Sequence, residues 1–496
     1  MHKRVKISGF NTNIVPTSKV MFFMVKTEGF SEKEELTKHI VDNNFKILNL
    51  CHIPEDGKLK TLSFSAKDRN RVLEVLEYGE RVDGSSLFSF IEPGKSDIYI
   101  MPRVEKFFIN SFASVPTLNV LCDYLDENGK PLDVAPANVL AKAERKLHES
   151  NRIVLRALAE LEYYVIAKHE NEIPFPGMPD KNYHDSTPFT KFECLRNETL
   201  VALAEAGIAT KYSHSEVGRI FDKDNTLIEQ HEIEFKTQSL RDMAENLSIA
   251  KWILRNLSAK HGVSVSFIPK ISLEHAGTGM HIHLCAIKDG KNIIADSDGG
   301  LSSDALKMIG GVLEHAPSLA AFANSTPVSY LRFIARKESP MHICWASRNR
   351  LALIRIPLWW SFLKSESKDS CRETFEYRAP DAFASTHLLL AGIALTVEYG
   401  LKKGEETLKV ARELQVEVGH GELKGLKILP RSCFEAAANL EKDRTFYETD
   451  DVFPKRLIDK TVEKLKAFND KDLNKELASK PDGVLQSLLK EYMHYG

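Results

Sequence analysis

Glutamate and histidine pairs in strand-like segments are the residues of this sequence whose types and spacing fit chemistry. Glu160 and Glu162 lie two residues apart in an apolar stretch, and His281 and His283 lie two apart after a glycine-rich turn. Side chains two residues apart on a strand point to the same face of a sheet, so each pair presents its ligand atoms together. One such pair is typical of the polar side of a half-exposed strand, and the histidine pair alone also fits half of a zinc site.

Three further segments repeat the pattern and favour a shared site. They contain Glu216 in Ser-His-Ser-Glu-Val, Glu232 in Gln-His-Glu-Ile-Glu, and Glu376 with Arg378 in Thr-Phe-Glu-Tyr-Arg. Several carboxylates with one or two imidazoles and no thiolate suit Mg²⁺ or Mn²⁺ better than zinc. Such cations commonly bind the phosphates of a nucleotide and neutralise charge during phosphoryl transfer. The pattern therefore predicts a metal site that handles phosphate.

Arginines suited to phosphate or carboxylate follow in the same half of the chain. Arg348, Arg350 and Arg355 stand close together among apolar residues, and Arg332 precedes them. A guanidinium binds phosphate or carboxylate through two parallel hydrogen bonds, although surface ion pairing is the commoner role of arginine. The sequence has neither a Gly-x-x-x-x-Gly-Lys-Ser/Thr loop nor a Gly-x-Gly-x-x-Gly turn that opens a helix after a strand. We therefore expect any bound ATP to be held by metals and arginines.

Composition excludes several classes of protein. The 496 residues include 67 basic and 69 acidic side chains, a net charge of −2, which argues against nucleic acid as the main partner. Seven cysteines without a Cys-x-x-Cys pair argue against a disulfide framework and fit a reducing compartment. The N-terminus does not resemble a signal peptide, and the most apolar run, 388–397, is too short to span a membrane. We expect a cytoplasmic protein that has no membrane contact.

The periodicity predicts an α+β fold. A small unit of strands with one or two helices is expected over the first 125 residues, beginning with a helix at 31–43 whose Ser31 and Glu34 form a capping box. A larger unit follows, with a polar loop at about 171–187. Its expected strands are 157–166, 212–217, 231–236, 264–269 and 279–286, and its expected helices include 135–148, 192–206, 239–261, 310–319, 386–400 and 452–468.

The order of these segments resembles the glutamine synthetase family. The likeness rests on Glu-Leu-Glu, His-Ser-Glu-Val, Gln-His-Glu-Ile-Glu-Phe-Lys, Gly-Thr-Gly-Met-His-Ile-His, Arg-Asn-Arg-x-x-x-Ile-Arg-Ile-Pro and Glu-Tyr-Arg-x-Pro-Asp. Val82-Asp-Gly-Ser-Ser86, followed by Lys95-Ser-Asp97, resembles the family's N-terminal signature, so the likeness spans about 40–470. It implies an N-terminal extension and β-grasp domain at 1–125 and a catalytic domain of curved antiparallel sheet with C-terminal helices at 126–496. It also implies self-association into rings, usually dodecamers, with active sites between subunits.

The resemblance also implies a role for each residue of the site. One divalent cation, Mg²⁺ or Mn²⁺, would bind Glu162, Glu216 and Glu232, and a second would bind Glu160, His281 and Glu376. The substrate glutamate would contact Glu162, Gly277, His281, Arg332 and Arg378, and ATP would contact His283, Arg350 and Arg355. The catalytic set would be Asp83 from a neighbouring subunit, Tyr183, Glu338 on a closing loop, and Arg350.

The implied reaction is the ATP-dependent synthesis of glutamine. ATP would phosphorylate the γ-carboxylate of glutamate, and Asp83 and Glu338 would attract ammonium and take its proton. Ammonia would then attack the acyl phosphate, shielded from water by the loop of Glu338. Three alternatives stay open. The first is a γ-glutamyl amine ligase that uses methylamine, ethanolamine or a polyamine, the second is an inert structural or sensory relative, and the weakest is a zinc hydrolase built on His281 and His283.

The sequence departs from the family pattern at several positions near this site. Ala276 stands where the family usually has asparagine, and Thr374 stands where an arginine is usual, with Arg372 two residues away. The stretch 358–371, which contains Trp359 and Trp360, is longer than the usual link, and Ile334-Ala335 replaces an expected Val-Pro before the closing loop. The sequence alone leaves open whether Arg372 substitutes for the missing arginine and whether these changes admit an amine larger than ammonia.

Overall fold

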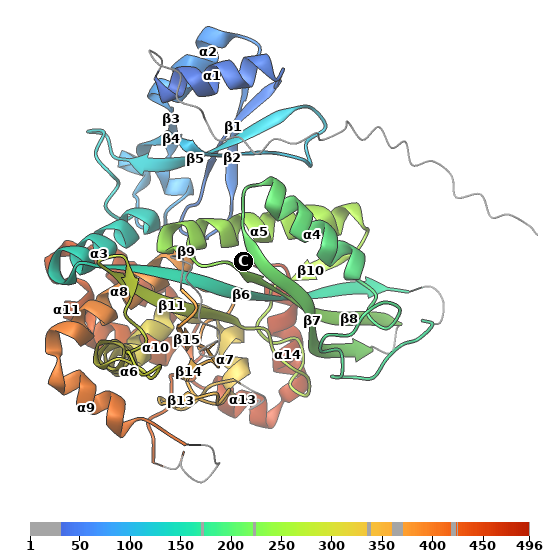
Figure 1. The fold of residues 1–496 in the computed structure, drawn as a ribbon. Helices are drawn as coiled ribbons and strands as arrows, with labels where there is room; N and C mark the ends of the chain where they lie inside the picture. Colours follow the sequence, from blue (N-terminus) through green and yellow to red (C-terminus); the bar gives the residue numbers. More distant parts are fainter. Residues whose placement is uncertain are drawn as a thin grey trace, which may run out of the picture.

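The computed structural model describes residues 31–169, 173–221, 225–334, 339–359, 371–417, 423 and 425–495. Each of two sheets forms the basis of one unit (Figure 1), and one continuous cluster of buried apolar side chains runs through both units. None of the helices in these ranges is long and apolar enough to cross a membrane. The expected extension before residue 31 lies outside the described residues.

The smaller unit is a five-stranded sheet covered by two helices. Its strand order is β2-β1-β5-β4-β3, with β1 parallel to β5 and the other neighbours antiparallel. In Figure 1 the helices lie on the outer side of this sheet, away from the larger unit. The elements are α1 (Glu32–Asp42), β1 (Ile47–His52), β2 (Lys60–Ser65), α2 (Arg69–Tyr78), β3 (Glu80–Asp83), β4 (Asp97–Ile109) and β5 (Thr117–Leu125), with short 3₁₀ turns at Gly84–Ser86 and Pro93–Lys95.

The first helix begins where the sequence predicted. The Ser31 hydroxyl accepts a hydrogen bond from the Glu34 amide at 3.3 Å, and the Glu34 carboxylate accepts one from the Ser31 amide at 2.8 Å. This reciprocal pair satisfies two amide groups that the helix itself leaves without partners. Leu36 and Ile40 then lie on the inner face and are fully buried against the sheet.

The larger unit is organised around a ten-stranded, mostly antiparallel sheet. Its main path runs β13-β14-β15-β11-β6-β8-β7, and β9, β10 and β12 pair at its margins. Among the described strands of this larger sheet, only β13 and β14 pair in parallel. The strands are β6 (Ile153–Lys168), β7 (Thr210–Phe221), β8 (Thr226–Phe235), β9 (Gln238–Ser239), β10 (Ser264–Ser266), β11 (Met280–Lys288), β12 (Lys291–Asn292), β13 (Trp345–Ser347), β14 (Ile354–Ile356) and β15 (Phe375–Tyr377).

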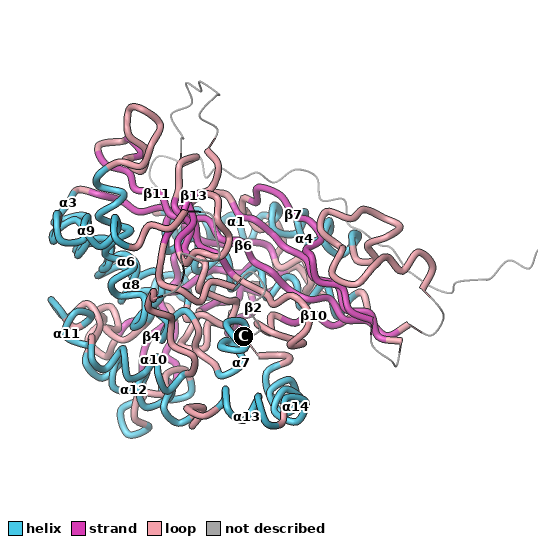
Figure 2. Tube along the Cα trace, turned by 90° about the horizontal axis from the view of Figure 1, so that it is seen from below, coloured by secondary structure: helices cyan, strands magenta, loops and turns pink. Residues whose placement is uncertain are grey.

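Helices cover this sheet on the side of the smaller unit and at one end. In Figure 1, α4 and α5 lie between the large sheet and the smaller unit, and in Figure 2 α3, α6, α8 and α9 gather at one end of the strands. The helices are α3 (Pro136–Asn151), α4 (Glu193–Glu205), α5 (Leu240–Lys260), α6 (Ser303–Ala323), α7 (Pro327–Ile334), α8 (Thr386–Lys403), α9 (Glu405–Glu413), α10 (Cys433–Lys442), α11 (Arg444–Tyr447), α12 (Lys455–Ala467), α13 (Leu473–Ser479) and α14 (Pro481–Tyr492), with a 3₁₀ turn at Thr449–Asp451.

The observed strands differ from the expected ones mainly in length. β7 continues past the expected 217 to Phe221, and β8 begins at Thr226, before the expected 231, because the ladder between them resumes after a register shift between Ser215 and Arg219. The strand expected at 264–269 is shorter, and β10 ends at Ser266. Beyond it the Pro269 carbonyl accepts a hydrogen bond from the Thr278 amide at 2.9 Å, so this backbone pairs away from β6.

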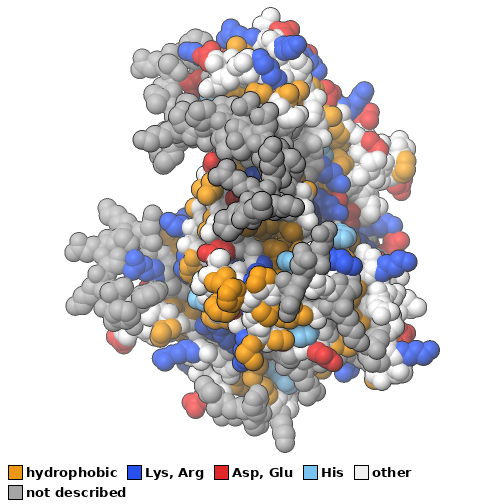
Figure 3. All heavy atoms as spheres, turned by 90° about the vertical axis from the view of Figure 1, so that its right-hand side faces the viewer, with side chains coloured by type: hydrophobic (Ala, Val, Ile, Leu, Met, Phe, Trp, Pro, Cys, Tyr) orange, Lys and Arg blue, Asp and Glu red, His pale blue; other side chains and the backbone are white. Residues whose placement is uncertain are grey.

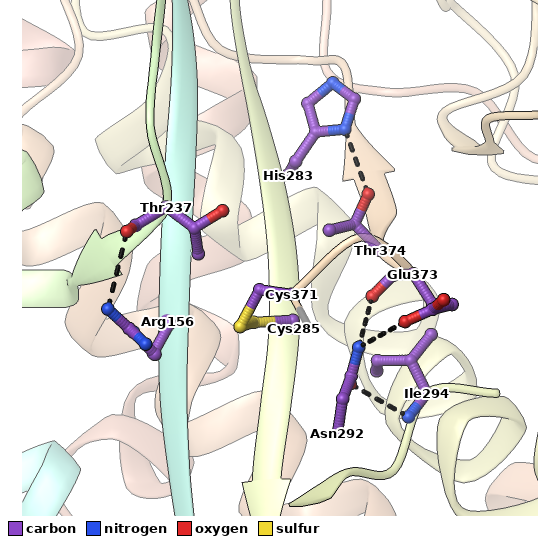
Figure 4. Close-up of a disulfide and its surroundings, with 9 residues drawn as sticks. All are labelled: Arg156, Thr237, His283, Cys285, Asn292, Ile294, Cys371, Glu373 and Thr374. Carbon is purple, nitrogen blue, oxygen red and sulfur yellow. Dashed lines mark hydrogen bonds between the residues drawn. A yellow bond between two sulfur atoms is a disulfide. The ribbon is translucent and has the colours of Figure 1, made fainter. Parts of the chain in front are cut away.

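The expectation that the cysteines form no disulfide framework needs one correction. Cys285 on β11 and Cys371 are joined by a disulfide, with Cα atoms 5.7 Å apart and a sequence separation of 86 residues (Figure 4). Sequence spacing does not reveal this pair because the fold brings β11 beside the segment that enters β15. The other described cysteines are free: Cys51, Cys122, Cys194, Cys344 and Cys433.

Candidate active site

The acidic and histidine pairs predicted from the sequence meet across neighbouring strands. In the ladder between β6 and β11, His281 lies opposite Glu160. Glu162 lies opposite Glu232 between β6 and β8, and His283 lies opposite Glu376 between β11 and β15. Because side chains at paired positions share a face, the register alone collects carboxylates and imidazoles on one surface.

All of these side chains except Glu376 line a cavity of about 440 Å³ on that surface. It also contains every residue expected to bind glutamate or ATP, and Tyr183. The charged and histidine side chains of its lining are Glu160, Glu162, Asp180, Lys211, His214, Glu216, Glu232, Glu234, His281, His283, Arg332, Arg350, Arg355 and Arg378.

One candidate metal group agrees with a ligand set expected from the sequence. Ligand atoms of Glu160, His281 and Glu376 all lie within 4.8 Å of one another. His281 Nδ1 is 2.8 Å from Glu160 Oε2 and 3.6 Å from Glu376 Oε1. Burial, followed by the charge of Arg378, lowers the pKa of His281 to about 4, so its imidazole is neutral and has a lone pair for a cation.

The second group includes a residue that the sequence analysis missed. His214, Glu216 and Glu232 bring ligand atoms within 4.8 Å of one another. His214 Nδ1 is 3.1 Å from the Ser215 carbonyl, and its Nε2 is 3.2 Å from Glu232 Oε1. A hydrogen bond from one ring nitrogen to a backbone carbonyl is the usual arrangement of a metal-binding histidine. The signal was present, since His214 and Glu216 are two apart on one strand.

Glu162 lies in the same cavity but is held by other partners. Its Oε2 accepts hydrogen bonds from Gln230 Nε2 and from the Gly279 amide, both at 2.8 Å. Burial and then the nearby Glu216 raise the pKa of Glu162 to about 8. Burial, with the charges of Glu160 and Glu162, likewise raises the pKa of Glu232 well above its ordinary value.

Buried carboxylates of this kind fit divalent cations. Without a counterion they repel one another, and protons take the place of the missing positive charge. Their oxygen atoms, joined by one imidazole in each group, form a donor set suited to Mg²⁺ or Mn²⁺. The donors present therefore fit the two cations that the sequence predicted.

Arginines form a wall that adjoins the first group. Arg355 Nη1 is 2.7 Å from Glu376 Oε2, and Arg378 also pairs with Glu376. Arg332 is buried and donates hydrogen bonds from Nη1 to the carbonyls of Ala379 and Pro380 at 3.0 Å. Positive and negative groups thus alternate around the cavity, as binding of both a carboxylate and a metal requires.

Gly277 brings backbone close to the arginine wall. A Cβ atom at this position would lie 2.8 Å from the Pro269 carbonyl and 3.2 Å from Arg332 Cγ, so a side chain there would displace one of them. The neighbouring Ala276 also lines the cavity, and its carbonyl accepts a hydrogen bond from the Tyr164 hydroxyl at 2.6 Å. The backbone at Ala276 is therefore held even though the family's usual asparagine is absent.

The segment that carries Tyr183 is anchored by a buried arginine. Arg219 is fully buried and pairs with Glu229 at 3.1 Å and Asp185 at 3.2 Å. The amide of His184 donates to the Ser215 carbonyl at 3.0 Å, and the His184 ring stacks on Tyr183 with centroids 4.2 Å apart. These contacts fix Tyr183 at the edge of the cavity, where 47% of its surface is exposed.

A second cavity, of about 690 Å³, adjoins the first. Both are lined by Lys211, Glu234, His283 and Pro357. The second cavity is basic where the first is acidic, because Arg156, Lys211, Lys236 and Arg372 lie in its wall. Thr374 and Arg372 both line it, which places Arg372 close to the position of the missing arginine.

Of the expected catalytic residues, Asp83 is not in the first cavity, and Glu338 is not among the described residues. Asp83 is exposed at the end of β3 in the smaller unit and is not part of the lining. Hydrogen bonds from Ser86 and Ser85, with Ser96, hold the pKa of its carboxyl well below the ordinary value. Glu338 lies outside the described residues, as do Ala335 and Trp360.

Comparisons with known proteins identify the family of the chain. The sequence model "Glutamine synthetase, catalytic domain" matches residues 133–477, and "Glutamine synthetase, beta-Grasp domain" matches residues 44–127. The chain belongs to the glutamine synthetase family. The predicted family and the predicted fold class, a β-grasp domain followed by a catalytic domain of this type, are therefore confirmed.

Individual relatives are similar over most of their length. The glutamine synthetase of Thermotoga maritima is 30% identical over 417 residues, which cover 83% of this chain and 90% of the relative. The glutamine synthetase of Pyrococcus abyssi is 32% identical over 410 residues, which cover 81% of this chain and 86% of the relative.

Solved structures share the fold at lower identity. The glutamine synthetase of Plasmodium falciparum has a TM-score of 0.74 at 22% identity, covering 90% of this chain and 97% of that one. A structure titled "GmaS/ADP complex" has a TM-score of 0.73 at 19% identity and covers 90% of this chain and 99% of that one.

Proposed function

We propose that this chain is an ATP-dependent ligase that forms glutamine from glutamate and ammonia through γ-glutamyl phosphate. The observation that carries the proposal is the pair of adjoining cavities. One is acidic, with two carboxylate–imidazole groups, the other is basic, and His283 lies in both. A phosphoryl donor in the basic cavity would direct its terminal phosphate past His283 toward a carboxylate substrate in the acidic one.

The cation sites follow from the two groups of donors. Glu160, His281 and Glu376 would hold one divalent cation, and Glu216 and Glu232 would hold the other, together with Glu162 or His214. Bound Mg²⁺ or Mn²⁺ neutralises charge on the transferring phosphoryl group. Glu162 and Glu232, whose pKa values are raised, would release their protons to solvent on binding a cation, because metal ligands must be deprotonated.

The substrate glutamate would lie between the arginine wall and the glycine turn. Arg332 and Arg378 would attract its carboxylates, and Gly277, His281 and Glu162 line the same cavity beside them. The ATP phosphates would face Arg350 and Arg355. The second cavity, which we call the nucleotide cavity, would add the positive charge of Arg372. Charge on the γ-phosphoryl group is thereby met by guanidinium groups as it moves.

Ammonia would be formed and delivered at the edge that carries Tyr183. Glu216 and Tyr183 provide a negative and aromatic surface for ammonium, and Glu338 would close this side. Asp83 is held ionised by its serine partners, which suits attraction of ammonium better than removal of its proton. Glu338 is therefore the better candidate for the base.

A contribution from Asp83 requires a second subunit, because Asp83 lies outside its own chain's cavity. We propose self-association into rings, with the dodecamer of the resemblance as the specific prediction. Exposed apolar side chains, on the side of the molecule seen in Figure 3, provide surface for such contacts. Analytical ultracentrifugation measures the assembly, and a monomer with full activity would contradict it.

A γ-glutamyl amine ligase is the second candidate. GmaS, a γ-glutamylmethylamide synthetase, shares the fold. The rings of Tyr183, His184 and His214 lie within 5.3 Å of one another, centroid to centroid, and aromatic faces also stabilise alkylammonium ions. The small acidic cavity favours ammonium, so glutamine synthesis stays the main proposal.

Phosphate release from Mg²⁺-ATP with glutamate separates these functions. The acceptors are ammonium, hydroxylamine, methylamine, ethanolamine and putrescine. We expect saturation by ammonium at low concentration and little response to the organic amines. Turnover only with a larger amine would support the second candidate, and binding of ATP and glutamate without turnover would indicate an inert relative.

Two further expectations accompany this function. ATP and glutamate are abundant in the cytoplasm, so we place the enzyme there, which cell fractionation tests. We also place the domain boundary near residue 125, between β5 and α3. Limited proteolysis tests that boundary.

A further inference from the structure

The disulfide lies in the wall of the proposed nucleotide cavity. Cys285 follows His283 by two residues on β11, and Cys371 is three residues before Thr374 (Figure 4). Cys285 is fully buried, whereas Cys371 is partly exposed and lines the nucleotide cavity. The bond thus joins the strand that carries His283 to the segment that carries Arg372 and Thr374.

We call residues 371–374 the strap. Besides the disulfide, hydrogen bonds hold it at three places. Thr374 Oγ1 is 3.2 Å from His283 Nδ1, and Trp359 Nε1 donates to the Thr374 carbonyl at 3.2 Å. Asn292 Nδ2 donates to the Glu373 carbonyl at 2.9 Å and to its carboxylate at 3.2 Å (Figure 4). The strap therefore positions Arg372 in the nucleotide cavity. Through Thr374 it also positions the ring of His283, which lines both cavities.

A disulfide at this place is unusual for an enzyme that uses cytoplasmic ATP. Cellular thiols keep cysteines reduced there, and the disulfides that do form are usually catalytic or redox-sensing. No thiol chemistry belongs to the proposed reaction. Because Cys371 is the accessible partner, an incoming thiolate would attack its sulfur and release the buried Cys285.

We propose that the Cys285–Cys371 pair is a thiol–disulfide switch that sets the affinity for Mg²⁺-ATP by fastening the strap to β11. The identity of the nucleotide rests on the proposed function. A dithiol reductant supplies two electrons and two protons. Its first thiolate forms a mixed disulfide with Cys371, and its second thiolate displaces Cys371, which leaves two cysteine thiols and the oxidised dithiol. A disulfide oxidant reverses the exchange.

Reduction leaves the strap with its hydrogen bonds alone. Arg372 and Thr374 then move more freely, and the contact from Thr374 to His283 loosens. The affinity for Mg²⁺-ATP is expected to fall at least about fivefold, the lower end of typical coupling between linked sites. The KM for glutamate changes less, because Arg332 and Gly277 lie outside the nucleotide cavity.

The test uses the full chain in two redox states. One sample is treated with oxidised and the other with reduced dithiothreitol, and peptide mapping after alkylation identifies the bridge. Calorimetry then gives the Kd of Mg²⁺-ATP, and steady-state kinetics give both KM values. The wild-type comparison needs no variant. C371S should behave as the reduced protein in both treatments, whereas C194S, which changes an exposed free cysteine on α4, should keep the full response.

Several results would overturn the inference. These are a Kd that is equal in the two states, an oxidised protein without the bridge, and a redox response that C194S abolishes. If Mg²⁺-ATP bound in neither state, the proposed function itself would fail and the inference with it. Nucleotide binding without redox dependence would leave the proposed function intact.

Discussion

Replacing His214 by alanine is expected to weaken binding of one Mn²⁺ ion by about 10- to 100-fold. The neutral imidazole has its Nδ1 beside the Ser215 carbonyl and directs Nε2 toward Glu232 at 3.2 Å. Burial lowers the pKa of His214, so at neutral pH the Nε2 lone pair is available to a cation. Loss of a group that only orients a metal ligand weakens metal binding about 10- to 100-fold, or about 1.4 to 2.8 kcal/mol, and loss of the ligand itself costs at least as much.

Electron paramagnetic resonance measures this effect directly. A Mn²⁺ titration of the wild type should give two classes of tight site, and H214A should convert one of them into a weak site. The wild-type spectrum should show hyperfine couplings to the nitrogens of two imidazoles, and the H214A spectrum should show couplings to one. H184A is the matched control, because His184 stacks against His214 with centroids 4.4 Å apart but is outside the ligand group. Unchanged affinity and couplings in H214A, with loss of a site in E216Q, would refute a ligand role for His214.

Three further predictions concern stability and the nucleotide. R219M should lower the free energy of unfolding by about 3 to 5 kcal/mol, measured by chemical denaturation, because it leaves buried Glu229 without its arginine partner; a change below about 1 kcal/mol would contradict this. In EDTA the stability should fall as pH rises from 4.5 to about 8, because native Glu162 keeps a proton that the unfolded chain has lost. E162Q should reduce this dependence of stability on pH, measured by thermal unfolding. A wild-type protein whose stability rises with pH would contradict a proton on native Glu162. R372A should raise the KM for ATP about tenfold with little change in the KM for glutamate, and steady-state kinetics check both.

The part of the site that follows from strand geometry could be predicted from the sequence. The two-residue period of a strand was enough to predict that Glu160 and Glu162 share a face, and that His281 and His283 do so too. That these pairs would lie opposite one another depended on register, which the resemblance supplied and the periodicity did not. His214 was missed even though it obeys the same period with Glu216, because histidine beside serines reads as a polar strand face.

Contacts that join distant segments of the chain could not be predicted from a sequence pattern. Cys285 and Cys371 are 86 residues apart, and only the pairing of β11 with β15 brings them together. The Arg219 network was invisible for the same reason, since Asp185 and Glu229 flank it from different segments. The roles of Asp83 and Glu338 stay predictions, because one requires a neighbouring subunit and the other lies outside the described residues.

The cost of the buried acids argues against the inert alternative. Glu160, Glu162, Glu232 and Glu376 are at least four-fifths buried, and mutual repulsion with burial raises the pKa of Glu162 and Glu232. Buried charges that lack partners destabilise a fold, and apolar replacements of such groups are often neutral or stabilising. A structural protein gains nothing from keeping them, whereas a ligase needs them to hold cations beside phosphate. E232Q should therefore stabilise the metal-free protein while it abolishes phosphate release, and a variant that kept full turnover would show that this acid has no catalytic purpose.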